Sequence, residues 1–143
     1  MSASRRNGRA YALQLLYARD NDASADVANA AGAWAKDFEL ELDDDNVAFA
    51  RALAAAAATN STKIDEQIGQ SSKNWRIERM SRVDRNILRL GACELIAFPD
   101  VPTKVVINEA VELAKRFGAA ESSAFVNGVL DRIAAAVGRR PED

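Results

Sequence analysis

Arginine is the residue type in this chain best suited to chemistry with a ligand, and it occurs in clusters. Arg5, Arg6 and Arg9 stand together near the amino terminus, and no acidic residue precedes Asp20. A second basic segment covers residues 73–89, where six basic residues accompany only two acidic ones. A guanidinium group pairs bidentately with phosphate and stacks on nucleobases. Because only a few of the 19 basic residues are lysine, the two segments predict a surface for a phosphate-bearing ligand.

The acidic residues lie elsewhere in the chain, so a net charge of −2 conceals an uneven distribution. Residues 20–50 contain nine acidic residues against one basic residue, Lys36. Such a separation in a nearly neutral chain predicts basic surfaces set against an acidic one. For the acidic block itself we expect the ordinary role of solvating helix faces.

The residue types that most enzymes and metal sites require are scarce or absent. The chain has no histidine, a single cysteine (Cys93), and neither a GxGxxG nor a GxxxxGK[ST] phosphate loop. Histidine is the commonest general base and metal ligand, and one cysteine cannot build a thiolate metal site. Carboxylate-only catalysis stays open, but no pair of carboxylates stands out. We therefore predict no catalytic site, no metal and no cofactor.

The single cysteine also bears on the cellular compartment. No internal disulfide can form, which favours a reducing cytoplasm. No apolar run approaches the length of a bilayer, and residues 1–9 lack the apolar stretch of a secretory signal. We predict a cytoplasmic protein without membrane contact, in which Cys93 is a small buried apolar residue.

The composition predicts helix throughout the chain. Alanine dominates the apolar 48%, while glycine (seven) and proline (three) are scarce, and these two residues are the least favourable in a helix. Neither a repeat nor a Gly/Ser linker divides the sequence, which predicts one all-α domain over residues 1–143. We expect about seven helices, at 4–18, 25–36, 43–58, 61–69, 81–98, 102–117 and 122–137, with a basic arm at about 1–10 and a frayed tail at 138–143.

Capping residues and apolar periodicity place these helices. Ser81, followed by an acid three residues later, resembles a capping box, and Ser122 is expected to cap the last helix. Trp34 and Trp75 are expected to anchor the core, and Gly128 to permit close backbone approach. Three buried stripes at helical spacing are expected: Val83, Ile87, Leu90 and Leu95; Val106, Ala110, Leu113 and Phe117; Val126, Val129, Ile133 and Val137.

Three stretches of the chain resemble, in the same order, the motifs of one family. Residues 100–131 read DVPTKVVINEAVELAKRFGAAESSAFVNGVLD, residues 75–95 read WRIERMSRVDRNILRLGACEL, and residues 5–17 read RRNGRAYALQLLY. These resemble the C-terminal signature, the central motif and the Arg-rich first helix of the NusB family of transcription antitermination factors. The KVVINEAVELAKRFG and FVNGVLD blocks are highly specific, whereas residues 20–70 match only in length and helical character.

The resemblance implies a fold, a set of partners and a function. It implies a compact bundle of seven helices in two helical subdomains. It implies a protein partner, the small-subunit ribosomal protein NusE, and binding of the pair to the boxA element of nascent RNA. With NusA and NusG on RNA polymerase, such a complex lets ribosomal RNA operons be transcribed without premature termination. A homodimer of the free protein stays open.

The resemblance also assigns roles to individual residues. Those that match RNA-contacting positions are Arg5, Arg6, Arg9, Arg89 and Lys104, and Phe125 joins them as an aromatic that could stack on a base. Those that match contacts with the ribosomal-protein partner are Tyr17, Glu78 and Asp84. Arg89 lies five residues after Asp84, about 140° around the same helix, so the two side chains are expected to face different ligands.

Several of these assignments compete with an ordinary structural role. Phe125 lies off the apolar stripe of its helix and is either core or a stacking platform worth about 1–3 kcal/mol per base. Tyr17 has the alternative of a half-buried core residue, and Arg79 and Arg82 that of ion pairs with the acidic block. Gly8 lowers helix stability by about 1 kcal/mol relative to alanine, so we expect the arm to be mobile until RNA binds.

Two functions of other classes compete with antitermination. One is an RNA-recognition domain like the one that precedes the catalytic part of a ribosomal RNA cytosine methyltransferase. That function needs a methyl-donor-binding domain after the bundle, which we do not expect because the chain ends at Asp143. The other is a protein-interaction bundle in which the arginines are incidental, and salt-dependent RNA binding would distinguish it.

Overall fold

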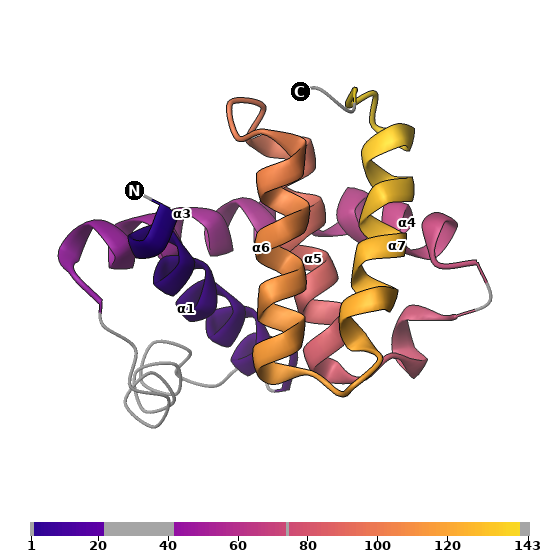
Figure 1. Cartoon of the computed structure of the whole chain (residues 1–143), viewed down its shortest axis with the longest axis horizontal. Helices are drawn as coiled ribbons and strands as arrows, with labels where there is room; N and C mark the ends of the chain where they lie inside the picture. Colours follow the sequence, from indigo (N-terminus) through magenta and orange to yellow (C-terminus); the bar gives the residue numbers. More distant parts are fainter. Residues whose placement is uncertain (1, 22–41, 74, 141–143) are drawn as a thin grey trace. The chain divides into compact units, whose positions relative to one another are not determined.

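The computed structural model describes residues 2–21, 42–73 and 75–140, and all regular structure in these ranges is helical. The prediction of an all-α fold is therefore confirmed. The helix predicted over 25–36, which contains Trp34, lies outside the described residues. The elements (Figure 1) are α1 (Ser2–Asn21), α3 (Asp44–Thr59), α4 (Ser61–Ser71), η1 (Ile77–Arg79, a 3-10 turn), α5 (Arg82–Ala97), α6 (Thr103–Phe117) and α7 (Ser122–Ala136).

The chain forms two compact units, Met1–Ala55 and Ala56–Asp143, in agreement with the expected two helical subdomains. The first unit contains α1 and most of α3. The second contains α4, η1, α5, α6 and α7. None of the helices in the described ranges is both long enough and apolar enough to span a bilayer.

In the first unit, Gly8 allows α1 to approach α3 closely. A Cβ atom at position 8 would lie 2.8 Å from both Asn46 Oδ1 and Phe49 Cδ2. The first turn of α3 is capped by Asp43, whose carboxylate accepts a hydrogen bond from the Asn46 backbone N–H at 2.8 Å. Gly8 therefore lowers the intrinsic helix stability of the arm, but the close packing of α1 against α3 requires a glycine at this position. Mobility of the arm without RNA stays a prediction.

In the second unit, α5, α6 and α7 pack against one another, and α4 packs against α5 and α7 (Figure 1). Each predicted stripe is buried except at one end, where Val83, Phe117 and Val137 are half-buried. Cys93 is fully buried in α5, as predicted. Burial, together with the neighbouring charge of Glu94, raises the pKa of its thiol to about 12. The thiol therefore stays protonated at neutral pH and packs as an apolar group.

The close approach between α5 and α7 occurs at Gly91. A Cβ atom at this position would lie 2.7 Å from Leu130 Cδ1, and Leu130 is fully buried. At Gly128, where the sequence predicted a close backbone approach, the nearest atom to an added Cβ is a nitrogen of the Arg132 side chain, at 3.6 Å. The prediction for Gly128 is wrong because, among the described residues, no backbone atom of another element lies within 4 Å of a Cβ atom there.

Ser81 and Ser122 were both expected to cap helices, and only Ser81 does so. Ser81 caps α5 as predicted, because its Oγ accepts a hydrogen bond from the Asp84 backbone N–H at 3.0 Å. Ser122 is instead the first residue of α7. Its Oγ accepts from the Ala119 backbone N–H at 3.0 Å, which closes the turn before the helix rather than the first turn inside it.

Arg139 binds the C-terminal end of α5 to the start of α6. The last carbonyl groups of a helix have no partner within it, and the Arg139 guanidinium supplies donors to them. The turn between the end of α7 and Arg139 contains Gly138, whose φ is 85°. Arg139 lies inside the segment predicted to fray, and residues 141–143 lie outside the described residues. The acceptors, at 2.6–3.2 Å, are the carbonyl oxygens of Glu94, Leu95, Phe98 and Val101 and the hydroxyl of Thr103.

Substitution of two helical glycines tests the close approach of α5 and α7. Gly91→Ala should lower the free energy of unfolding by about 1–3 kcal/mol, because the new methyl group overpacks against Leu130. Gly69→Ala in α4 is the matched control, since no described atom lies within 4 Å of a Cβ there. Higher helix propensity should make that variant more stable by up to about 1 kcal/mol. Urea denaturation measures both, and a shift of the same sign in the two variants would contradict the proposed packing.

Candidate nucleic-acid interface

The arm of the first unit holds its three arginines in different environments. The guanidinium carbons of Arg5 and Arg9 lie 4.5 and 5.5 Å from the centroid of the Phe49 ring. Arg5 Nη1 also donates to the backbone carbonyl of Asp45 at 3.3 Å. Arg9 is 6% exposed and Arg5 is half-buried, whereas Arg6 is exposed. Cation–π contacts thus hold Arg5 and Arg9 against α3, and Arg6 is the most accessible of the three.

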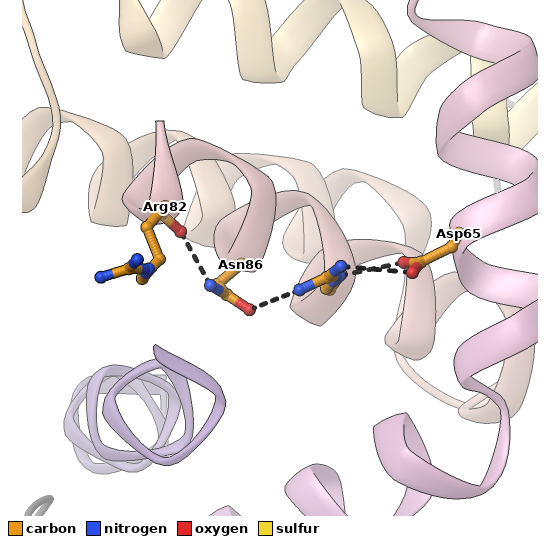
Figure 2. A network of polar contacts seen from close by, with 4 residues as sticks. Asp65, Arg82 and Asn86 are labelled. Atoms are coloured by element: carbon orange, nitrogen blue, oxygen red, sulfur yellow. Dashed lines mark hydrogen bonds and ion pairs between the residues drawn. The ribbon is translucent and has the colours of Figure 1, made fainter. Parts of the chain in front are cut away.

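Arg89 forms an ion pair that joins α5 to α4. Its Nε and Nη2 atoms donate to the two carboxylate oxygens of Asp65 at 2.9 and 3.2 Å. Its Nη1 donates to Asn86 Oδ1 at 3.3 Å, and Asn86 Nδ2 donates to the backbone carbonyl of Arg82 at 2.8 Å (Figure 2). The side chains of Arg89 and Asp65 are 24% and 38% exposed. A phosphate group at Arg89 would therefore compete with an existing bidentate pair.

Trp75 lies outside the helices and is 57% exposed, so the prediction of a core anchor is wrong. It ends a tight turn in which Ser72 Oγ donates to the Trp75 carbonyl at 2.6 Å and the Trp75 N–H donates to the Ser72 carbonyl at 3.2 Å. Lys73 within this turn has a positive φ of 57°. Arg132 of α7 donates from Nε to the Ser71 carbonyl at 2.5 Å. These bonds fix the backbone of Trp75 while its ring remains exposed.

Trp75 and Phe125 line a pocket of about 250 Å³ in the second unit. Their ring centroids lie 6.4 Å apart with 72° between the planes, an edge-to-face arrangement. Phe125 is half-buried in the first turn of α7, so it is not a fully buried core residue. Asp84 lines the same pocket as Phe125. The family resemblance, however, assigns Asp84 to the protein partner and Phe125 to RNA.

The remaining predicted residues lie outside this pocket. Glu78 is exposed on η1, and Lys104 is exposed in the first turn of α6. Tyr17 is half-buried on α1 in the first unit. The structure thus brings Asp84 and Phe125 together, but it does not bring either of them to Glu78 or Lys104 in one cavity. Trp75 is a pocket residue that the sequence did not predict, although it lies within the basic segment and outside every apolar stripe.

The Arg89–Asp65 pair should contribute more to stability than an exposed ion pair. We expect Arg89→Ala to lower the free energy of unfolding by about 1–2 kcal/mol, between the values typical of exposed and buried pairs. Lys115→Ala is the matched control, because Lys115 Nζ lies 3.5 Å from Glu112 Oε1 with both side chains exposed. That variant should change stability by less than about 0.5 kcal/mol. Thermal melts of both variants test this, and equal losses would show that the Asp65 pair is no stronger than a solvated one.

Comparison with protein families and curated proteins gives a consistent result. Residues 6–135 match the family model described as NusB family. Transcription antitermination protein NusB of Myxococcus xanthus is 49% identical over 137 residues, which cover 95% of this chain and 98% of that protein. The protein of the same name from Sorangium cellulosum is 48% identical over 140 residues, with 98% of both chains covered.

Solved structures show the same similarity. A T. maritima NusB structure superposes with a TM-score of 0.78 at 34% identity, covering 92% of this chain and 90% of that one. The antitermination factor chain in a crystal structure of NusB and NusE in complex with dsRNA gives a TM-score of 0.80 at 28% identity, with 95% and 99% covered. The sequence motifs, the helical architecture and the matched family model agree, and the chain belongs to the NusB family.

Proposed function

We propose that the chain is a transcription antitermination factor that pairs with the ribosomal protein NusE and binds boxA RNA in nascent ribosomal RNA transcripts. The observation that carries this proposal is the match over almost the whole chain to proteins named transcription antitermination protein NusB. The similar structure of NusB and NusE in complex with RNA supports the same two partners. With NusA and NusG, the complex would support processive transcription by RNA polymerase in the cytoplasm.

Both units contribute contacts to phosphate in this proposal, and the second unit adds a stacking contact. In the first unit, exposed Arg6 contacts phosphate, and half-buried Arg5 contacts RNA beside it. Arg9, which is 6% exposed against Phe49, joins them only where RNA binding moves its side chain. In the second unit, exposed Lys104 contacts phosphate and Phe125 stacks on a base. Arg89 contacts RNA only if a phosphate group replaces the Asp65 carboxylate as acceptor for part of its guanidinium group.

Three residues are assigned to NusE in this proposal, one in the first unit and two in the second. Glu78 is exposed, whereas Tyr17 and Asp84 are half-buried. In this proposal NusE binds at these three residues, and phosphate groups of the RNA bind at Arg6 and Lys104. A homodimer of the free protein through the same residues is the alternative, and it would compete with NusE.

The proposal is tested by titrating labelled boxA RNA and a scrambled RNA of equal composition, with and without purified NusE. We expect weak binding of boxA RNA by the chain alone, and tighter and sequence-dependent binding with NusE, because the pair presents more contacts than either protein. Fluorescence anisotropy at a fixed salt concentration measures the affinities. Equal affinity for both RNAs in the presence of NusE would refute the proposal.

Arg6 should contribute to RNA binding without contributing to folding. Arg6→Ala is expected to weaken boxA binding and to reduce the slope of log affinity against log salt by about 1, because one phosphate contact is lost. Its stability should stay within about 0.5 kcal/mol of the wild type. Arg51→Ala removes another exposed arginine of the first unit and serves as the matched control. A salt slope that is unchanged in Arg6→Ala would exclude Arg6 from the phosphate contacts.

A further inference from the structure

We infer that Asp65 competes with RNA phosphate for the Arg89 guanidinium and thereby limits the affinity of this protein for RNA. The inference rests on the proposed RNA-binding function, and it assigns a role to an acidic residue of α4 that the family resemblance leaves without one. Asp65, Asn86 and Arg89 all belong to the second unit, where they lie on α4 and α5 (Figure 2).

The Asp65 carboxylate occupies the edge of the guanidinium that a phosphate group would use. Arg89 Nε and Nη2 donate to its two oxygens at 2.9 and 3.2 Å. Arginine binds carboxylate and phosphate through the same pair of parallel hydrogen bonds. The two anions also repel each other at short distance. A phosphate group can therefore bind at this edge only after the Asp65 carboxylate has left it.

The pair lies where RNA can reach it. The side chains of Arg89 and Asp65 are 24% and 38% exposed, so neither charge is sealed inside the fold. Water can solvate the Asp65 carboxylate once it leaves, which keeps the cost of separation below that of a buried pair. Asp65 is the more exposed partner, so it can turn toward solvent while Arg89 stays in place. The pair therefore weakens a phosphate contact at Arg89 without preventing it.

Asn86 is a positioning residue for the Arg89 guanidinium. It is 1% exposed, and its Oδ1 accepts a hydrogen bond from Arg89 Nη1 at 3.3 Å. Its amide is itself fixed within α5, because Nδ2 donates to the Arg82 backbone carbonyl at 2.8 Å. This support comes from α5 and not from α4, so it persists when Asp65 is replaced. Removing the carboxylate should thus leave the guanidinium in position with its Nε and Nη2 donors no longer bonded to Asp65.

Loss of the carboxylate should strengthen RNA binding rather than weaken it. In the wild type, a phosphate contact at Arg89 is offset by the loss of the bonds to Asp65. Without the carboxylate, the same contact contributes in full. Phosphate contacts carry no sequence information, so the gain should be similar for every RNA. Asp65 therefore limits affinity without setting the sequence preference.

The test compares the wild type, Asp65→Asn, Arg89→Ala and the double variant, each saturated with NusE and titrated with labelled boxA and scrambled RNA. Asp65→Asn should bind both RNAs about 3- to 10-fold more tightly, with a salt slope steeper by about 1, as expected for one additional phosphate contact. The double variant should bind no more tightly than Arg89→Ala, because the gain requires the guanidinium. Fluorescence anisotropy at several salt concentrations measures both quantities.

Two further variants control for charge and for folding. Glu66→Gln removes the same charge from an exposed neighbour of Asp65 on α4, and screening should keep its effect below about 2-fold. Asp65→Asn preserves the shape of the side chain and one acceptor for Arg89. Asp65→Ser removes the carboxylate by a different replacement and should show the same gain. Circular dichroism melts identify a temperature at which the variants are folded.

The outcomes separate the inference from the proposed function. If folded Asp65→Asn and Asp65→Ser bind RNA no more tightly than the wild type, Asp65 is not a competitor, although RNA binding by the protein stands. An equal gain in Glu66→Gln, or a gain that persists without Arg89, would reveal a general effect of charge and overturn the inference as well. If the wild type with NusE binds boxA and scrambled RNA equally, the proposed function itself fails, whatever the behaviour of the Asp65 variants.

Discussion

The second unit depends on the contact between Gly91 of α5 and Leu130 of α7. Because a side chain at position 91 would meet Leu130 at 2.7 Å, the absence of a side chain sets how closely the two helices approach. The first turns of the same helices carry Asp84 and Phe125. Protein interiors are close-packed, so this contact fixes how the two helices pack in the core of the second unit. Both residues line one pocket, so the two helices that meet at Gly91 also form part of its walls.

Some arginines of this protein make contacts within the fold and others are exposed, and the charge distribution along the sequence does not distinguish the two groups. Arg9, Arg89 and Arg139 make contacts within the chain: with the Phe49 ring, with the Asp65 carboxylate, and with the carbonyl groups at the end of α5. Arg6 and Arg79 are exposed. The planar guanidinium suits both uses, because its fixed donors match carboxylates and carbonyls as well as phosphates. The arginine-rich composition therefore reflects the needs of the fold as well as those of the proposed RNA binding.

The helices could be predicted from the sequence because apolar periodicity and capping residues act locally. Ser81 caps α5 where predicted, and the centres of the three stripes are buried. Contacts between residues distant in sequence could not be predicted: Asp65 lies 24 residues before Arg89, and nothing in their spacing links them. Trp75 was misjudged because tryptophan usually packs in the core, whereas here a turn closed by Ser72 leaves it exposed. The RNA and partner residues came from family motifs, and their roles remain proposals.

The most direct measurement of the central claim is photo-crosslinking of boxA RNA to the chain in its complex with NusE, with the crosslinked residues identified by mass spectrometry. We expect crosslinks in the arm at residues 5–9 of the first unit, where Arg6 is exposed, and at Phe125 of the second unit. Crosslinks confined to the C-terminal half of α6 or to the exposed face of α3, with none in the arm or the pocket, would contradict it.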